Sequence, residues 1–270
     1  MKLRANALLG GGLVAAVVAV ALLALVWTPY DPLAMEFADK LRPPSAVHWL
    51  GTDEYGRDVA SRAMTAASTS VLLALLSVVG AVLPGVLVGL LAGFLRGWTD
   101  RLLMAVNDAL LAFPGILLAL GVMVVLGPGQ YGIVLALGLA YAPTVVRVVR
   151  GAVVSLRERE FVEASRMIGN SEWVTMLRHV LPHCVAPVAV LATSMFGWVL
   201  LSESALSFLG LGVAPPAPTW GNMLAGARTY LATAVWLGVV PGLCIALTLL
   251  GVNLLGDAVR DRLDPRMGAA

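Results

Sequence analysis

The chain has 270 residues, of which 59% are hydrophobic and only 13% are charged, and its formal net charge is +2. Soluble domains carry about 25% charged residues, so this shortage of charge excludes an ordinary soluble domain and indicates that much of the chain faces lipid. A net charge this small and scattered also argues against nucleic acid as a partner.

Six apolar runs are long enough to cross a bilayer, whose hydrocarbon core takes about 20 helical residues. The first run, 5–27, follows a basic start but has no A-x-A cleavage site, which favours an uncleaved anchor over a signal peptide. A turn-rich sequence at 126–132 separates the third run from the fourth. The later spans are predicted at about 69–95, 102–125, 131–149, 185–207 and 231–255. The sequence therefore predicts an all-α membrane protein with six transmembrane helices.

Glycines at every fourth position mark the second span, at Gly85, Gly89 and Gly93. Small residues at this spacing lie on one face of a helix and let a second helix approach closely. We therefore expect this face to pack against another span.

The basic residues predict the orientation, because cytoplasmic loops of membrane proteins carry an excess of Lys and Arg. If the N-terminus is cytoplasmic, most of the 18 basic residues lie on the cytoplasmic side. The exceptions on the outside are then Lys40, Arg42, Arg57, Arg62 and Arg228. The inverted orientation reverses this ratio, so we expect both termini to be cytoplasmic.

The segment between the fourth and fifth spans predicts a helix-turn-helix on the cytoplasmic side. An amphipathic helix over 156–168 is followed by Gly169, a residue typical of the turn after a helix. Ser171 is placed to cap a second helix that runs to His179, before Pro182.

A specific resemblance lies in this segment. Glu163-Ala-Ser165, three residues, Gly169, nine residues and His179-Val-Leu-Pro182 is similar to the pattern E-A-A-x3-G-x9-I-x-L-P. That pattern is the EAA loop of permease subunits of binding-protein-dependent ABC importers. Ser165 and His179 are mild departures from it. Stretches at 48–58, 203–221 and 253–266 resemble the outer loop, the segment after the fifth helix and the C-terminus of the C-type permeases for dipeptides, oligopeptides and nickel.

The resemblance implies a MetI-like type I ABC importer permease fold. It divides the chain into an N-terminal transmembrane helix at 1–28, an extracytoplasmic segment at 29–65, a five-helix permease core at 66–256 and a cytoplasmic tail at 257–270. The core includes the loop at 150–184, which the resemblance makes a coupling helix docked on an ATPase subunit. The residues implied in this coupling are Glu163, Ala164, Ser165, Gly169, Arg178, Leu181 and Pro182.

The implied partners are a homologous second permease subunit in a heterodimer, two ABC ATPase subunits and an extracytoplasmic solute-binding protein. The location is then the bacterial inner membrane, in contact with the lipid bilayer. The implied cargo is a dipeptide or oligopeptide, with nickel or a metal chelate as the alternative within the same family.

No ATP-binding site is expected in this chain. Its only lysines, Lys2 and Lys40, lie outside any Gly-x4-Gly-Lys-Ser/Thr phosphate loop, so ATP and Mg would be bound by the partner ATPase subunits, with no cofactor here. The sequence contains no Ser-His-Asp set or paired carboxylates in a supporting context, and we expect a subunit that is not an enzyme. His179, His183 and Cys184 are close in sequence, but Pro182 is expected to interrupt the helix between the histidines and argues against a metal site.

Two carboxylates lie inside predicted spans. Such residues are candidates for ion or proton sites, but we expect Asp108 to pair with an arginine at the membrane edge, such as Arg147 or Arg150. Glu203 is either paired in this way or part of an outer gate. Asp53, Arg57 and Asp58 are expected to form a solvated, self-paired loop rather than a catalytic group. The resemblance implies that this loop caps the outer mouth and docks the binding protein, with Gly51, Thr52, Asp53, Gly56, Arg57 and Asp58 as the candidate residues.

Two functions of other classes remain as alternatives. A proton-coupled secondary transporter would use Asp108 and Glu203, but it predicts an internal inverted repeat, which the sequence does not display. An intramembrane enzyme would need a catalytic pair at membrane depth, and only isolated carboxylates occur there.

Overall fold

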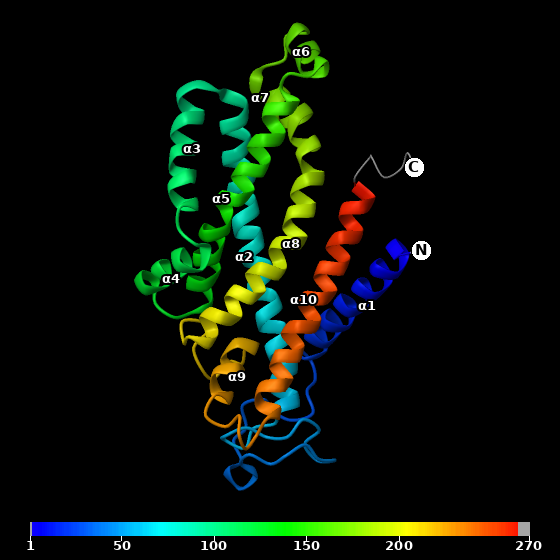
Figure 1. The fold of residues 1–270 in the computed structure, drawn as a ribbon, viewed down its shortest axis with the longest axis vertical. Coiled ribbons are helices and arrows are strands. Elements are labelled where there is room, and N and C mark those ends of the chain that lie inside the picture. Colours follow the sequence, from blue (N-terminus) through cyan, green and yellow to red (C-terminus); the bar gives the residue numbers. More distant parts are fainter. Residues whose placement is uncertain (1, 264–270) are drawn as a thin grey trace.

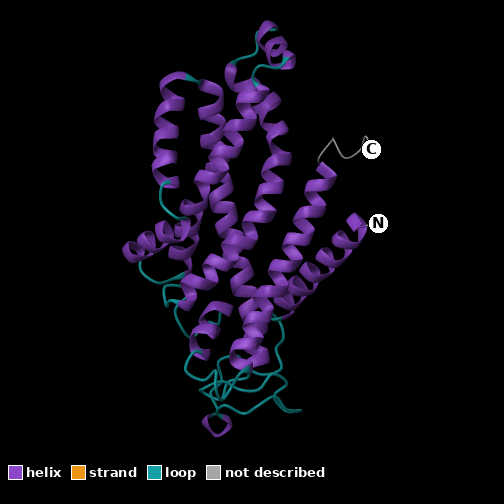
Figure 2. Ribbon diagram, viewed as in Figure 1, coloured by secondary structure: helices purple, strands orange, loops and turns teal. Residues whose placement is uncertain are grey.

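The computed structural model describes residues 2–263, and the regular structure in this range is helical apart from one isolated bridge between Thr52 and Asp58 (Figure 2). The long helices are α1 (Lys2–Leu23), α2 (Val59–Leu95), α5 (Gln130–Leu156), α8 (Leu181–Phe208) and α10 (Trp236–Leu263). The shorter elements are η1 (Phe37–Asp39), α3 (Gly97–Leu111), α4 (Gly115–Leu126), α6 (Glu160–Met167), α7 (Glu172–Val174), the π-helical turn η2 (Thr175–Val180) and α9 (Trp220–Ala227).

Five helices of the described range are long and apolar enough to cross a membrane, or six if α3 and α4 together form one span. Figure 1 shows that α6 and α7 project from one end of the bundle. The loops that precede α2, and α9, lie at the opposite end. The ends of α1 and α10 that carry the chain termini both point away from the loops that precede α2, in the direction of α6. This arrangement agrees with an even number of crossings.

The third span is not the single helix predicted over 102–125. α3 and α4 are bent by 91° at a short break, so that α3 runs beside α2 and α5 while α4 turns aside and packs on α5 (Figure 1). The cause is Pro114, which has no amide hydrogen to continue the helix and disfavours helical backbone in the residue before it. Pro114 itself is extended, with φ −54° and ψ 129°.

The boundaries of other spans also differ from the predictions. α2 begins at Val59, well before the predicted start at 69, because the Asp58 side chain caps it inside the outer loop. α10 continues as a helix to Leu263, so the first part of the predicted tail at 257–270 is helical. Residues 264–270 of that tail lie outside the described range.

The contact between α2 and α5 is the most extensive helix pair in the fold. A Cβ atom added at Gly85 would lie 2.6 Å from Val145 Cβ, and one at Gly93 would lie 2.7 Å from Val153 Cβ. At Gly89, the added atom would lie 2.7 Å from the carbonyl oxygen of Val146. The glycine stripe is therefore confirmed as a packing face, because only the missing Cβ atoms allow α5 to come this close.

The N-terminal helix is fastened by the same device on α10. A Cβ atom added at Gly10 would lie 2.7 Å from the backbone nitrogen of Leu255, and one at Gly251 would lie 2.9 Å from Leu13 Cβ. At each of these glycines, the absence of a side chain lets a turn of the other helix pack directly against the backbone. The N-terminal and C-terminal helices form a pair that flanks the rest of the bundle (Figure 1).

Replacing Gly89 with alanine should destabilise the protein. Alanine favours a helix over glycine by about 1 kcal/mol, but overpacking at a closed site costs about 1–3 kcal/mol. The melting temperature of the purified subunit should therefore fall by several degrees. The matched control is Gly151→Ala in α5, where an added Cβ meets no atom within 4 Å and the melting temperature should stay or rise. Equal shifts in the two variants would contradict the packing role of Gly89.

Candidate functional site

The segment at 157–182, here called the α6–α7 hairpin, is turned back by a glycine. Gly169 has φ +87°, a backbone conformation that side-chain-bearing residues rarely adopt. Its amide donates to the carbonyl of Arg166 at 3.0 Å, and the amide of Asn170 donates to that of Ser165 at 3.2 Å. These two bonds form a Schellman motif. The predicted glycine turn is confirmed, although α6 begins at Glu160 rather than near 156.

The second arm of the hairpin does not end before Pro182. The Ser171 hydroxyl accepts from the amide of Val174, as predicted for a cap, but α7 then continues through η2 directly into α8. The predicted end at His179 is wrong. A π-helical turn lacks the i→i+4 pattern that a proline interrupts, and here it precedes Pro182. The hairpin is therefore joined to α8 by continuous helix.

His179 and His183 consequently lie on one helix. His183 Nδ1 lies 2.8 Å from the carbonyl oxygen of His179, and its ring stacks on Phe161 with centroids 5.0 Å apart. No group of three His, Cys, Asp or Glu side chains that could hold a metal occurs within residues 2–263.

Ser165 holds the two arms of the hairpin together. Its hydroxyl oxygen lies 2.9 Å from that of Thr175 and accepts from the Asn170 side-chain amide at 3.1 Å. Ser165 is buried, whereas Glu163 and Ala164 are exposed. Of the other residues implied in coupling, Gly169, Arg178 and Pro182 are exposed and Leu181 is half-buried.

Exposed apolar side chains on the hairpin were missed by the sequence analysis. Met167 is 87% exposed, Ile168 is 78% exposed and Trp173 is 56% exposed. Met167 and Ile168 end α6 just before the glycine turn, and Trp173 lies in the first turn of the second arm. An apolar pair directly before a turn glycine, in a segment between two spans, is the signal that could have identified this surface.

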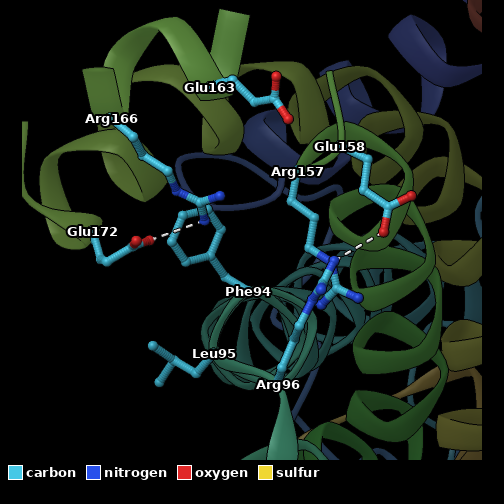
Figure 3. A pocket seen from close by; sticks show the side chains of 8 residues that line it. All are labelled: Phe94, Leu95, Arg96, Arg157, Glu158, Glu163, Arg166 and Glu172. Carbon is cyan, nitrogen blue, oxygen red and sulfur yellow. Dashed lines mark hydrogen bonds and ion pairs between the residues drawn. The ribbon is translucent and has the colours of Figure 1, made fainter. Parts of the chain in front are cut away.

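A charged cavity of about 460 Å³ lies between the α6–α7 hairpin and the end of α2 (Figure 3). Arg96 pairs with Glu158 at 2.8 Å, and Arg166 pairs with Glu172 at 3.1 Å. Burial, and then the neighbouring Arg96, lower the pKa of the Arg157 guanidinium below its usual value. The cavity is lined by Phe94, Leu95, Arg96, Arg157, Glu158, Glu163, Arg166 and Glu172.

The two carboxylates predicted inside spans have different surroundings. Asp108 forms an ion pair with Arg147 at 2.8 Å, which agrees with the expected pairing at the membrane edge. Glu203 is fully buried. It accepts from the Ser207 hydroxyl at 2.7 Å and from the Ser204 hydroxyl at 3.4 Å. Its partners in the described chain are hydroxyl groups rather than an arginine.

Asp53, Arg57 and Asp58 of the outer loop are self-paired, as predicted, but they are buried rather than solvated. Asp53 is 5% exposed. Its carboxylate accepts from the backbone amides of Tyr55 at 2.8 Å and Arg57 at 3.0 Å. The guanidinium groups of Arg57 and Arg62 complete the cluster, with Nε atoms 2.6 and 3.4 Å from Asp53 Oδ2. The expectation of a solvated loop is wrong because long-range packing covers these charges, and Arg62 was missed because it lies beyond the loop motif.

Asp58 joins this loop to the start of α2. Its carboxylate accepts from the amide and hydroxyl of Ser61 at 2.8 and 2.7 Å, and it lies 2.9 Å from His48 Nδ1. Trp236 of α10 donates its indole N–H to the Thr52 carbonyl at 3.2 Å. The loop is thus attached to both α2 and α10.

The two loop glycines are required by their backbone. Gly51 has φ +78° and Gly56 has φ +77°. A Cβ atom at Gly51 would lie 2.7 Å from the carbonyl oxygen of Arg42, and one at Gly56 would lie 1.8 Å from that of Glu36. The predicted loop residues therefore shape the loop from within. Its exposed apolar side chains include Phe37, Val47, Trp49 and Tyr55.

Several known proteins are similar to this chain. Residues 85–269 match the family described as binding-protein-dependent transport system inner membrane component. The chain is 40% identical over 251 residues to a Brucella suis protein named as a peptide transport system permease, covering 93% of this chain and 84% of that protein. It is 45% identical over 251 residues to the glutathione transport system permease protein GsiD of Shigella flexneri, covering 93% and 83%.

A solved structure has a similar fold. It is the MetNI methionine ABC transporter in inward-facing conformations, which matches with a TM-score of 0.58 at 19% identity and covers 73% of this chain and 93% of that chain. At this identity the match concerns the fold alone. It agrees with the MetI-like architecture expected from the sequence.

Replacing Asp53 with asparagine should loosen the outer loop. The change removes the negative charge between Arg57 and Arg62, and breaking a buried ion pair costs about 3–5 kcal/mol. Trypsin should then cleave the loop at Arg57 far faster than in the unaltered protein. The matched control is Glu36→Gln, which neutralises an exposed carboxylate of the same loop and should leave the cleavage rate unchanged. Slow cleavage of the Asp53 variant would show that the buried cluster is not needed to close the loop.

Proposed function

Because this chain belongs to the family of binding-protein-dependent transport system inner membrane components, we propose that its α6–α7 hairpin couples an ATPase to the import of small peptides. The chain is the permease subunit of an ABC importer, a membrane component without catalytic activity of its own, and it works with ATPase and binding-protein partners.

The exposed surface of the hairpin carries this proposal. Met167 and Ile168, at the C-terminal end of α6, are 87% and 78% exposed, and α6 projects from one end of the bundle (Figure 1). Fully burying one such side chain is worth about 1.5–3 kcal/mol. Glu163 is exposed beside them and takes part in none of the ion pairs of the described residues. A partner with an apolar groove and a basic residue fits this surface.

The hairpin is also built to move as one unit. The Gly169 turn fixes the angle between its arms, and the contact between Ser165 and Thr175 holds them together. Its second arm continues into α8 without a break. ATP-driven closure of the ATPase subunits would then displace α8 with the hairpin and open the path toward the outside.

The translocation path for the cargo would lie at the interface between this chain and a second, homologous permease subunit. Exposed leucines such as Leu76, Leu83 and Leu87 follow one another along α2, which fits contact with lipid and with another transmembrane subunit. Two ATPase subunits would dock at the hairpins of the pair, and a binding protein would dock at the outer loop. The proposed division of this chain is a permease core at 66–256, preceded by the helix at 1–28 and the outer segment at 29–65 and followed by the tail at 257–270.

The cargo proposed is a small peptide. The relatives named above are a peptide transport permease and a glutathione transport permease, and glutathione is itself a small peptide. Nickel or a metal chelate stays as an outcome of the transport test.

Transport by the reconstituted complex tests the proposal. Vesicles that contain this chain, its second permease, the ATPase subunits and the binding protein should accumulate labelled peptide only when ATP is supplied to the ATPase side. The double variant Glu163→Arg, Gly169→Arg should lose uptake while ATP hydrolysis continues, because the docking surface and its turn are both altered.

The matched control is Asp257→Arg, which reverses an exposed charge away from the hairpin on α10 and should transport normally. Normal transport by the double variant would rule out the hairpin as the coupling element. Uptake that survives ATP depletion but stops with an uncoupler would identify a proton-coupled transporter, and uptake of nickel in place of peptide would reassign the cargo.

Orientation has a separate test. The excess of arginine near the hairpin supports a cytoplasmic hairpin and cytoplasmic termini. In a background without Cys184 and Cys244, a cysteine at Met167 should react with a membrane-impermeant maleimide in inside-out vesicles only. A cysteine at Trp49, which is 61% exposed on the outer loop, should react in right-side-out vesicles only. The reverse pattern would overturn the assigned sides.

A further inference from the structure

The C-terminal end of α2 is held by the α6–α7 hairpin rather than by its own chain neighbours. The last carbonyl groups of a helix have no partner within the helix, and α2 stops at Leu95 because Arg96 has φ +56°. The guanidinium of Arg157, the first residue of the hairpin, donates to the carbonyl of Gly93 at 2.5 Å. A cation at this position is also favoured by the negative end of the helix dipole.

Two further contacts join the same parts. The guanidinium of Arg166 lies 5.5 Å from the ring centroid of Phe94, and Arg96 pairs with Glu158 at 2.8 Å. Phe94 is buried, so the Arg166 guanidinium over its ring links the hairpin to a side chain of the core. Figure 3 shows these side chains reaching across the cavity from the hairpin and from α2.

The arginine at position 157 lowers the stability of the fold in one respect. Its Nε is buried and has no hydrogen-bond partner in the described chain, and an unsatisfied buried donor is costly. Local violations of this kind are typical of positions that serve function. The observation therefore favours a functional reason for placing a long cation under the hairpin.

The other end of α2 is tied equally firmly to the outer loop. Asp58 caps the helix, and Arg62 donates to the carbonyl of Pro32 at 3.1 Å and lies 3.4 Å from Asp53. Tyr30 donates its amide to the Ser61 hydroxyl at 2.9 Å. Between these ties, α2 is one helix of 37 residues, which spans about 55 Å at 1.5 Å per residue.

We propose that Arg157 is a positioning residue that fastens the hairpin to the end of α2, so that α2 carries the movement of the hairpin to the outer loop. This inference rests on the proposed coupling function of the hairpin and adds a second route beside α8. Movement of the hairpin would then reach the other face of the membrane, because the opposite end of α2 lies in the outer loop, which is the proposed docking site of the binding protein.

The test uses the complete reconstituted complex. Arg157→Ala should retain its ATPase subunits and its ATP hydrolysis, but transport per ATP should fall about tenfold, the change that corresponds to the loss of a charge-assisted hydrogen bond. Arg157→Lys keeps one cationic donor and should restore most of the ratio. The matched control is Arg159→Ala, which removes an exposed arginine two residues away and should transport as the unaltered protein does.

A second variant and a second readout separate this role from a structural one. Phe94→Leu keeps the core filled but removes the ring under Arg166, and it should lower the same ratio. Fluorescent labels at Arg159→Cys, an exposed hairpin position apart from the apolar docking surface, and at Trp49→Cys should both respond to ATP in the otherwise unaltered complex. In Arg157→Ala the label at position 159 should still respond, while the label at position 49 should not.

The outcomes distinguish the inference from the function beneath it. An unaltered complex without ATP-driven uptake would overturn the proposed function. An unaltered complex that works, together with Arg157→Ala that keeps its transport ratio and its outer-loop response, would overturn this inference alone. Loss of the ATPase subunits from Arg157→Ala would also overturn it, because the residue would then belong to the docking surface.

Discussion

The close approach of α2 and α5 is the constraint on which the rest of this structure depends. Lipid offers no hydrophobic driving force for two apolar helices to associate, so their contact relies on close packing. The absent Cβ atoms of Gly85, Gly89 and Gly93 allow the valines of α5 to pack directly against the α2 backbone. Because α5 leads into the hairpin and α2 ends beneath it, this contact also sets where the hairpin stands.

Several charged groups at the two ends of the bundle are held in ion pairs. Arg150 pairs with Asp100 through two bonds of 2.6 and 2.7 Å near the hairpin end, and Asp53 gathers its donors in the outer loop. Between these ends, Glu203 is bonded to serine hydroxyls inside the bundle. A charged group left alone at membrane depth is expensive. The two ends of the molecule are therefore the natural sites for the polar contacts that the proposed partners require.

The hairpin and the outer loop solve a common problem in different ways. Each must hold its shape outside the bundle, and each uses glycines with positive φ, Gly169 in the hairpin and Gly51 and Gly56 in the loop. The arms of the hairpin are held by the contact between Ser165 and Thr175, whereas the loop buries the Asp53 cluster and accepts a hydrogen bond from Trp236.

The sequence by itself determined the features that depend on neighbours along the chain. Runs of apolar residues located the spans, glycine spacing located the packing face of α2, and Gly169 with Ser171 located the turn of the hairpin. The permease resemblance followed from the spacing at 163–182 together with the stretches at 48–58, 203–221 and 253–266. These features follow from helix periodicity and backbone preference, which act over a few residues.

Only the tertiary structure decided the features that join distant residues. It bent the third span by 91° at Pro114, carried helix through Pro182, turned Ser165 inward toward Thr175 and brought Arg157 to the carbonyl of Gly93. It also buried Asp53 between arginines that the motif alone left in solvent. The physical reason is that burial and pairing depend on which elements pack together, and no local pattern in the chain records that choice.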